Sequence, residues 1–204
     1  GVFELLLNVI SPIAGTPGTP IELIECDEVP NDGFAGFDLR EASDDIIGTQ
    51  TMMGVTYFET LPEADNGVPL DALASPYTNI TPDTQTIFAR LEENILGCYD
   101  VIELDLIVNP APAIADPIDD YPLCDNDQDG TEDFDLTSKN TEIENSLPNI
   151  TLTYYNSEPD ADLGDPATEI PTPNAYPSAG AETIWVRAVN LDGCVTVSSF
   201  DLII

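Results

Sequence analysis

Hydrophobic and polar residues alternate within short blocks of this chain, and clusters of Pro, Gly, Asn and Asp separate the blocks. The alternation is clearest in residues 183–189 and 197–203. A period of two is typical of a β-strand with one buried face, and turn-forming residues between blocks mark the strand ends. No segment has the pattern of an amphipathic helix of three turns. The sequence therefore predicts an all-β protein of short strands.

The same motifs occur twice in the chain, between 96 and 98 residues apart. The repeated pairs are Phe37-Asp38-Leu39 with Phe134-Asp135-Leu136, residues 55–58 with 152–155, Ala64-Asp65 with Ala161-Asp162, residues 86–90 with 183–187, and Gly97-Cys98 with Gly193-Cys194. A period of this length indicates an array of small domains and not a solenoid. The length of 204 residues is enough for two domains of about 100 residues each.

Each copy has six or seven short strands rich in Thr, Val, Ile and Tyr. This pattern predicts an all-β fold of tandem immunoglobulin/fibronectin-like antiparallel β-sandwich repeats, with an open barrel as the alternative. We place the first Ig-like repeat at residues 12–108 and the second at residues 109–204. The Pro-rich segments 10–20 and 109–122 lead into the two repeats, and proline should stiffen them.

Residues 1–11 resemble the closing strand of each repeat, because Leu7–Ile10 matches residues 104–107 and 200–203. We interpret residues 1–11 as the closing strand of a preceding repeat, so that the sequence is an excerpt of a longer array. The alternative is a strand that fills the sheet edge of a neighbouring chain. In both cases the apolar side chains of this segment should be covered, because an open apolar edge promotes aggregation. These side chains are Val2, Leu5, Leu7 and Val9.

Four cysteines occupy repeated positions. Cys26 and Cys124 precede the first strong strand of their copies, and Cys98 and Cys194 lie near the ends. The spacings match neither a zinc site nor a thioredoxin-like pair, so we predict disulfides and an oxidising extracellular setting. The simplest of three connectivities joins Cys26 to Cys98 and Cys124 to Cys194. Four buried free thiols are the alternative.

The charge of the chain is strongly unbalanced, with 39 acidic residues, four basic residues and a formal net charge of −35. Nucleic acids and anionic membrane surfaces would repel such a protein, and no run of about 20 apolar residues predicts membrane insertion. Self-repulsion destabilises a compact acidic domain. We therefore expect bound cations, Ca²⁺ above all, to stabilise the fold.

Residues 125–130 form an Asp-x-Asp-x-Asp-Gly loop, which offers the oxygen ligands that Ca²⁺ prefers. The predicted ligands are Asp125, Asp127 and Asp129, the backbone carbonyl of Thr131, and an oxygen of Asp133 or Asp135. Leu136 takes the twelfth position, where an EF-hand has an acid, so the loop is not an EF-hand. The alternative is a solvated turn without metal.

Two other acidic segments are weaker candidates for calcium. In the first copy, Val29-Pro30 interrupts the acids of residues 27–33. Residues 158–162 with Asp165, and their counterpart 63–65, are either calcium ligands or exposed turns, and we favour turns.

The chain contains no histidine, which excludes the usual general base and the Ser-His and Cys-His nucleophile arrangements. We therefore expect that the protein is not an enzyme. The repeated aromatic residues fit two interpretations, a sugar-binding platform or core and cross-strand packing, and alternating strand positions favour packing. These residues are Tyr57, Phe58, Phe88, Tyr154, Tyr155 and Trp185.

The second copy presents its motifs in a fixed order: a cysteine, an Asp-rich loop, Phe-Asp-Leu, Tyr-Tyr, an acidic Ala-Asp turn, Thr-Ile-Trp-Val-Arg and Gly-Cys. This order resembles the tandem Ig-like repeats of the giant surface adhesins of gliding Bacteroidota, over residues 12–204. The first copy departs from it, with Phe88 in place of the Trp and a looser acidic loop. The resemblance implies a long cell-surface protein exported by the type IX system and used in adhesion and gliding.

The resulting hypothesis is a structural stalk or filament segment of an extracellular, cell-surface adhesin. Its expected partners are neighbouring repeats of the same chain, other copies in a filament, and a surface glycan or substratum. Two alternatives remain open, a glycan- or cell-binding module and an accessory domain of a secreted enzyme. Similar organisation in both copies favours the stalk, because a binding module would elaborate one copy.

Overall fold

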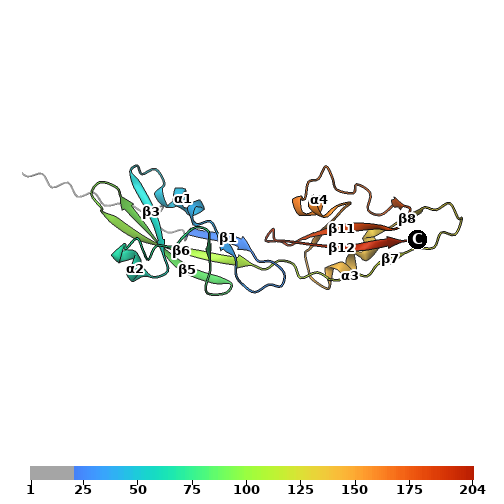
Figure 1. Ribbon diagram of the computed structural model, residues 1–204, viewed down its shortest axis with the longest axis horizontal. Coiled ribbons are helices and arrows are strands. Elements are labelled where there is room, and N and C mark those ends of the chain that lie inside the picture. Colours follow the sequence, from blue (N-terminus) through green and yellow to red (C-terminus); the bar gives the residue numbers. More distant parts are fainter. Residues whose placement is uncertain (1–20) are drawn as a thin grey trace, which may run out of the picture. The chain divides into compact units, whose positions relative to one another are not determined.

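The computed structural model describes residues 21–204, which form two units (Figure 1). Unit 1 consists of residues 21–25 and Gly33–Asn109, and unit 2 of Cys26–Asp32 and Pro110–Ile204. The division at Asn109 lies one residue beyond the predicted repeat boundary. The predicted preceding strand, with Val2, Leu5, Leu7 and Val9, and the first Pro-rich segment lie outside the described residues.

Unit 1 contains a four-stranded sheet in the order β1-β6-β5-β3 and a two-stranded sheet of β2 and β4. Strand β5 pairs antiparallel with both β6 and β3. The strands are β1 (Ile21–Cys26), β2 (Gly36–Phe37), β3 (Met53–Phe58), β4 (Tyr77–Thr78), β5 (Thr84–Glu93) and β6 (Tyr99–Asn109). The short helices are η1 (Leu39–Ala42), α1 (Ser43–Ile47) and α2 (Leu61–Asn66).

Unit 2 repeats this arrangement with sheets β7-β12-β11-β9 and β10-β8. Strand β11 pairs antiparallel with β12 and β9, and β7 adds to β12 in parallel. The strands are β7 (Tyr121–Pro122), β8 (Glu132–Phe134), β9 (Thr151–Tyr155), β10 (Tyr176–Ser178), β11 (Glu182–Val189) and β12 (Val195–Ile203). The short helices are η2 (Leu136–Lys139), α3 (Asn140–Glu144) and α4 (Glu158–Leu163).

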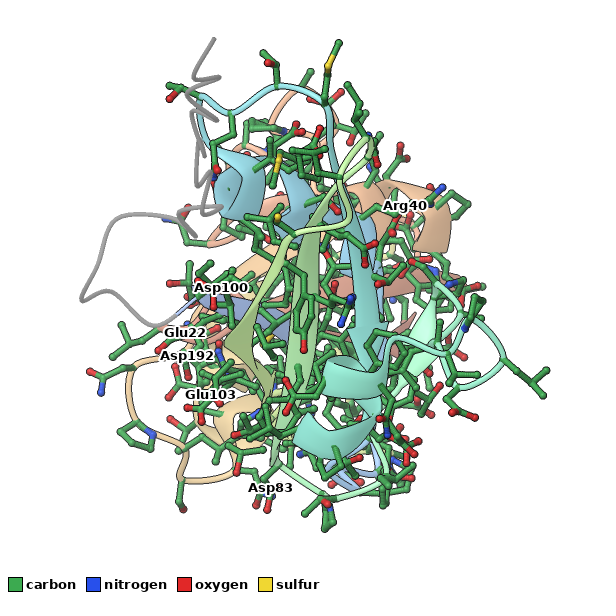
Figure 2. All side chains as sticks on the ribbon, turned by 90° about the vertical axis from the view of Figure 1, so that its left-hand side faces the viewer. Glu22, Arg40, Asp83, Asp100, Glu103 and Asp192 are labelled. Atoms are coloured by element: carbon green, nitrogen blue, oxygen red, sulfur yellow. A yellow bond between two sulfur atoms is a disulfide. The ribbon has the colours of Figure 1, made fainter. Side chains whose placement is uncertain are left out.

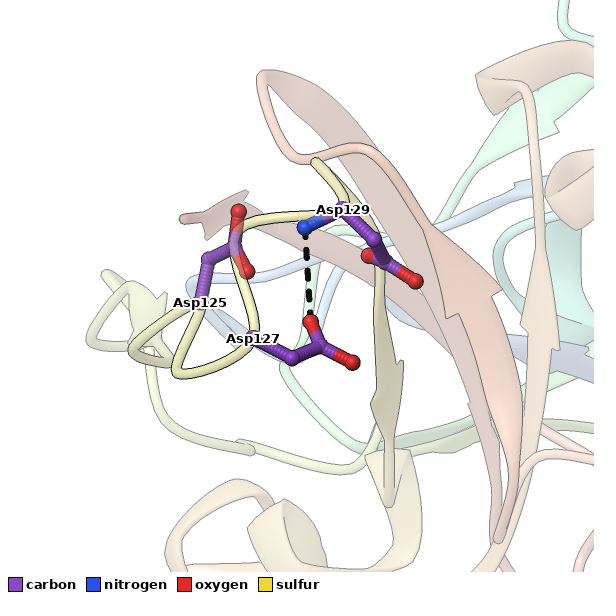
Figure 3. Close-up of side chains that lie close together, drawn as sticks. All are labelled: Asp125, Asp127 and Asp129. Atoms are coloured by element: carbon purple, nitrogen blue, oxygen red, sulfur yellow. Dashed lines mark hydrogen bonds between the residues drawn. The ribbon is translucent and has the colours of Figure 1, made fainter.

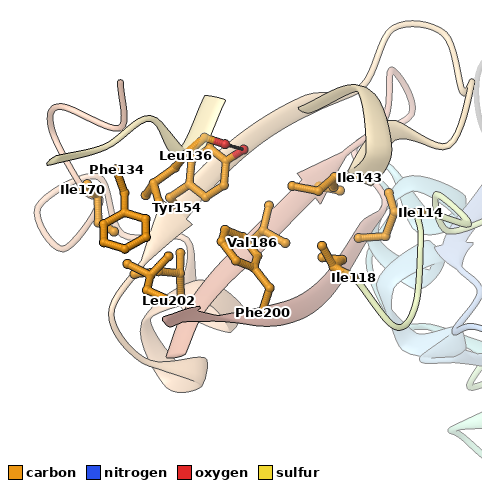
Figure 4. Close-up of a cluster of buried hydrophobic side chains, with 12 residues drawn as sticks. Ile114, Ile118, Phe134, Leu136, Ile143, Tyr154, Ile170, Val186, Phe200 and Leu202 are labelled. Atoms are coloured by element: carbon orange, nitrogen blue, oxygen red, sulfur yellow. Dashed lines mark hydrogen bonds between the residues drawn. The ribbon is translucent and has the colours of Figure 1, made fainter. Parts of the chain in front are cut away.

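One face of each four-stranded sheet forms the core. In β11, Ile184, Val186 and Ala188 are fully buried while the residues between them are partly exposed. The small sheet and the short helices cover this face and contribute side chains such as Phe134, Leu136 and Ile143 (Figure 4). The equivalent cluster of unit 1 includes Phe37, Leu39, Ile46, Ile87 and Leu104. Period-two burial between two layers confirms the prediction of tandem Ig-like β-sandwich repeats.

An arginine from the central strand anchors the second helix of each unit. Arg90 Nη1 donates to the carbonyl oxygens of Ala64 (2.8 Å) and Asp65 (3.0 Å) at the end of α2. Arg187 Nη1 donates in the same way to Ala161 (2.9 Å) and Asp162 (2.7 Å) at the end of α4. A cation at the C-terminal end of a helix donates hydrogen bonds to carbonyl groups that have no partner within the helix, and it interacts favourably with the helix dipole. Two of the repeated sequence motifs, the Ala-Asp pair and the strand that ends in arginine, therefore contact each other in both units.

The carboxylates lie on the outside of the units. Asp83, Asp100 and Glu103 of unit 1 and Asp192 of unit 2 are exposed (Figure 2). Asp27 is the one carboxylate among residues 21–204 that is buried, with 6% of its surface exposed. Over the same residues, no helix has the length and apolar character needed to cross a membrane.

Candidate functional site: the disulfide between the copies and the acidic loop

A disulfide joins the two sequence copies. It connects Cys26, at the end of β1, to Cys194, just before β12, across a sequence separation of 168 residues and a Cα–Cα distance of 5.4 Å. Cys98 and Cys124 are free thiols. The predicted pairing within copies was therefore wrong, although Cys26 and Cys194 are confirmed as disulfide residues. The physical reason is that Cys26–Asp32 packs with unit 2, which places Cys26 beside Cys194.

Hydrogen bonds hold the segment Cys26–Asp32 in unit 2. The Asn31 side chain donates to the carbonyl oxygen of Ala111 at 2.9 Å and accepts from the Ala111 N–H at 2.8 Å. This two-way amide contact satisfies both backbone groups of Ala111, as a strand neighbour would. Cys194 has no exposed surface, and Asp27 is buried. The segment is therefore a docked element of unit 2.

Cys194 lies in the turn between β11 and β12, which consists of residues 190–194. We call this turn, and the turn of residues 94–98 between β5 and β6, the tip of its copy. The Asn190 side chain accepts from the backbone N–H groups of Asp192 (3.0 Å) and Cys194 (2.9 Å) and donates to the carbonyl oxygen of Pro110 (2.9 Å). Asn190 therefore ties the tip to the segment that begins unit 2.

The acidic loop of the second copy, residues 124–130, brings three predicted ligands together. One carboxylate oxygen each from Asp125, Asp127 and Asp129 lies within 4.8 Å of the other two (Figure 3). Asp125 also accepts the N–H groups of Gln128 (2.6 Å) and Gly130 (3.0 Å), and Asp127 accepts that of Asp129 (3.3 Å). These bonds fold the loop into a tight turn. Three carboxylates in such a turn are the hard oxygen donors that fit Ca²⁺.

The other predicted carboxylate ligands, Asp133 and Asp135, are not part of this group. Thr131 donates its N–H and its hydroxyl to Asp129, at 2.8 and 2.9 Å. Asp133 lies in β8, where it pairs with Pro177 of β10. Asp135 caps η2 by accepting the Thr137 N–H at 3.1 Å. Among residues 21–204 the cluster is thus a group of three carboxylates. The use of Asp135 as a helix cap was not predicted, because sequence analysis placed no helix after it.

The second acidic segment, residues 158–162, is helix α4 and not a ligand loop. Ser157 caps its first turn by accepting the Asp160 N–H. Thr60 caps α2 in the same way, and Glu63 completes a capping box. Acidic residues in the first turn stabilise a helix because their negative charge lies at the positive end of the helix dipole. The repeated acidic residues therefore lie in the first turns of α2 and α4, and Arg90 and Arg187 bind the opposite ends of these helices.

The repeated aromatic residues pack within the units. Tyr154 and Tyr155 are each 2% exposed, and Tyr57 and Phe58 are also buried. Trp185 lies directly opposite Tyr155 in the β11–β9 pair, and Phe88 opposite Phe58. Such cross-strand aromatic pairs stabilise sheets. The packing interpretation is confirmed.

Comparison with known proteins supports the division into two copies. A family profile described as the Flavobacterium inter-domain disulphide bond domain matches residues 22–112 and again residues 120–204. No curated protein sequence matches the chain.

The solved structures that are similar share little sequence with this chain. A structure of titin domains I67–I69 is 8% identical with a TM-score of 0.31; the alignment covers 90% of this chain and 62% of that one. The human desmocollin-1 ectodomain is 11% identical with a TM-score of 0.25, over 96% of this chain and 38% of that one. A Bacteroides ovatus glucan-utilisation protein, SGBP-B, solved with a mixed-linkage heptasaccharide, is 11% identical with a TM-score of 0.23, over 95% and 46%.

Proposed function

Because this chain belongs to the Flavobacterium inter-domain disulphide bond family, with two copies in tandem, we propose that it is a structural stalk segment of an extracellular bacterial cell-surface adhesin. The observation that carries the proposal is the Cys26–Cys194 disulfide, which joins the acidic loop of one copy to the tip of the next. Disulfides persist in oxidising compartments, which supports an extracellular location. The order of motifs, which resembles gliding adhesins of Bacteroidota, supports the surface role.

The disulfide gives tension a covalent route past both folded units. A force applied at the two chain ends enters the bridge at Cys26 and leaves it at Cys194, so the 168-residue loop between them carries no stretching load. This loop contains most of the residues of both Ig-like units. A stalk built in this way holds its length even when a unit unfolds.

Calcium is the second part of the proposal. Mutual repulsion among the carboxylates of a chain with net charge −35 opposes compaction. The three carboxylates of Asp125, Asp127 and Asp129 are close enough to share one cation. We propose that Ca²⁺ at this loop stabilises unit 2 in the millimolar range typical of extracellular modules.

We assign the chain no catalytic role. The sequence offers no histidine for proton transfer. Its surface partners are proposed to be other repeats, with the adhesive ligand, a glycan or a substratum, held elsewhere in the adhesin.

Single-molecule stretching tests the stalk proposal. The oxidised chain, pulled from its two ends, should not release the 168-residue loop. Reduction, or the double variant C26S/C194S, should add about 570 Å of contour length at ~3.4 Å per residue. The variant C98S/C124S, which keeps the bridge, should behave as the unaltered protein. Full extension of the oxidised chain would contradict the proposal, because the load would then pass through the cores.

A further inference from the structure

The segment Cys26–Asp32 and the tip of unit 2 are both bound to one dipeptide, Pro110-Ala111. Asn31 of the segment donates to the Ala111 carbonyl oxygen at 2.9 Å and accepts the Ala111 N–H at 2.8 Å. Asn190 of the tip donates to the Pro110 carbonyl oxygen at 2.9 Å. Each cysteine of the disulfide follows or precedes one of these asparagines by no more than five residues. Adjacent peptide groups therefore fix the positions of both cysteines.

Asn190 connects this dipeptide to the bonding cysteine of the tip through its second amide atom. Its Oδ1 accepts the Cys194 N–H at 2.9 Å while its Nδ2 donates to Pro110. Asn31 binds the next residue, Ala111, so hydrogen bonds and one peptide bond form a continuous path from the segment to Cys194. Ala111 is buried, with 4% of its surface exposed. Water is therefore a poor substitute for the Asn31 amide at this point of the path.

The tip of unit 1 has a carboxylate where the tip of unit 2 has this amide. The Glu93 N–H donates to the Cys98 carbonyl oxygen at 2.9 Å. The Asn190 N–H donates to the Cys194 carbonyl oxygen at 3.1 Å in the same way, so Glu93 corresponds to Asn190. The Glu93 side chain accepts the Leu96 N–H, but an ionised carboxylate cannot donate to a backbone carbonyl oxygen. The tip that carries Cys98 therefore lacks the donor that the tip of unit 2 uses.

We propose that Asn31 and Asn190 are positioning residues for the disulfide and select which cysteine bonds Cys26. Their hydrogen bonds to the dipeptide hold the reduced segment at the tip of unit 2, and the disulfide locks an arrangement that exists without it. In the reaction two thiols lose two protons and two electrons and one S–S bond forms, while oxidised glutathione is reduced to two thiols. The inference rests on the stalk function, because it takes the bridge as given and identifies what determines it.

Accessibility alone would favour other partners for Cys26. Cys98 is partly exposed and Cys124 is exposed, whereas Cys194 has no exposed surface. Held by the two asparagines, the segment meets the Cys194 thiol at a high effective concentration, which the other two thiols lack. Docking, and not exposure, therefore decides the pairing.

The first measurement is the effective concentration of the thiol pair in the full chain with C98S/C124S. The protein is equilibrated with defined ratios of reduced to oxidised glutathione, and the bonded fraction is read from peptide masses after alkylation. We expect Asn31→Ala to lower the effective concentration about tenfold, which corresponds to ~1.4 kcal/mol. Glu28→Ala, at an exposed position of the same segment, should leave it unchanged. Fluorescence of Trp185 in β11 verifies that unit 2 is folded in each variant.

Asn190→Asp tests the other end of the path with little change of shape. It keeps an oxygen that accepts the Cys194 N–H and removes the donor to Pro110. We expect the effective concentration to fall roughly two- to tenfold, the contribution of one hydrogen bond. Leu191→Asp adds the same charge to the tip at a side chain that is 81% exposed, and it should have no such effect. Equal losses in both variants would assign the effect to charge and refute the role of Asn190.

The second measurement follows the choice of partner in the chain with all four cysteines. Reduced protein is oxidised by glutathione and its first products are mapped under non-reducing conditions. We expect Asn31→Ala to raise the share of Cys26–Cys98 and Cys26–Cys124 peptides about tenfold over the unaltered protein, by the same loss of preference for Cys194. An unchanged effective concentration and unchanged pairing, even with a less stable unit 2, would make Asn31 merely structural and overturn the inference alone. Absence of the Cys26–Cys194 peptide from the unaltered protein would contradict the stalk function as well.

Discussion

The two units have the same strands, helices and arginine anchor, but they differ in what covers the tip. In unit 2 the docked segment Cys26–Asp32 covers Cys194 and bonds to it. In unit 1 the equivalent Cys98 is partly exposed and its thiol is free. The comparison shows that equal positions in a repeat do not imply pairing within a repeat. A loop cysteine can serve the tip of the following copy.

The largest effect should come from removing the disulfide. A bridge that closes a 168-residue loop stabilises by about 5 kcal/mol in the chain-entropy treatment. Trp185 is the single tryptophan and lies in β11, so its fluorescence reports unit 2. In C26S/C194S we expect the fluorescence midpoint of thermal unfolding to fall by more than about 10 °C. C98S/C124S should leave it unchanged, and an equal loss in both variants would show that the bridge is not the cause.

The second effect tests whether the anchors of the two units are equivalent. Gly67 and Gly164 end α2 and α4 with φ of +60° and +65°. A Cβ there would lie 2.9 Å from Arg90 Cζ and 2.8 Å from Arg187 Nε. We expect Gly67→Ala and Gly164→Ala each to cost roughly 1–3 kcal/mol, measured by urea unfolding. Gly36→Ala, with nothing within 4 Å of its Cβ, is the control, and an equal cost there would refute the steric explanation.

A third effect concerns alkaline pH. Burial raises the pKa of the Tyr154 hydroxyl well above its ordinary value, and the nearby charges of Asp135 and Glu144 raise it further. In the unfolded chain this tyrosine ionises near pH 10. The contribution of the neutral Tyr154 hydroxyl to the free energy of unfolding is therefore complete below pH 10, and it is lost as the pH rises toward the pKa of the folded state. Burial also raises the pKa of Tyr57 in unit 1.

Unfolding followed from pH 8 to 11 should therefore show unit 2 losing stability above pH 10. Tyr154→Phe should remove this part of the pH dependence while leaving that of unit 1. An unchanged alkaline slope in Tyr154→Phe would mean that another group is responsible.

The smallest effect should be that of calcium, because the three carboxylates are largely exposed. We expect millimolar Ca²⁺, which is about one to ten times the Kd typical of extracellular modules, to stabilise unit 2 by roughly 0.4–1.4 kcal/mol and to raise its melting temperature by a few degrees. Asp127→Ala should abolish the shift, and Asp133→Ala, outside the cluster, should preserve it. A shift that survives Asp127→Ala would indicate general screening of charge.

The sequence predicted the fold because its signals were local and occurred twice. Alternation in residues 183–189 and the matched motifs specify strands whose faces and order follow from burial. The short helices were missed, because α4 and η2 are too brief for a 3.6-residue period. The sequence shows the two parts of the arginine anchor, the Ala-Asp pair and the strand that ends in arginine, as separate repeated motifs, and it does not show that they contact each other.

The disulfide partner could not be predicted in the same way. Cys26 and Cys98 lie in one copy, and nothing in their spacing shows that residues 26–32 pack with the other unit. Val29-Pro30 interrupts the acidic pattern of this loop, and from the sequence alone this interruption disfavours a metal site. In the structure Asn31 of this loop instead bonds Ala111, a contact that depends on tertiary packing.

The most direct test of the account is non-reducing peptide mapping of the oxidised protein. We expect a peptide that links Cys26 to Cys194, with Cys98 and Cys124 as free thiols. Peptides that link Cys26 to Cys98 and Cys124 to Cys194 would contradict it, because each copy would then be closed on itself and no covalent bridge would join them.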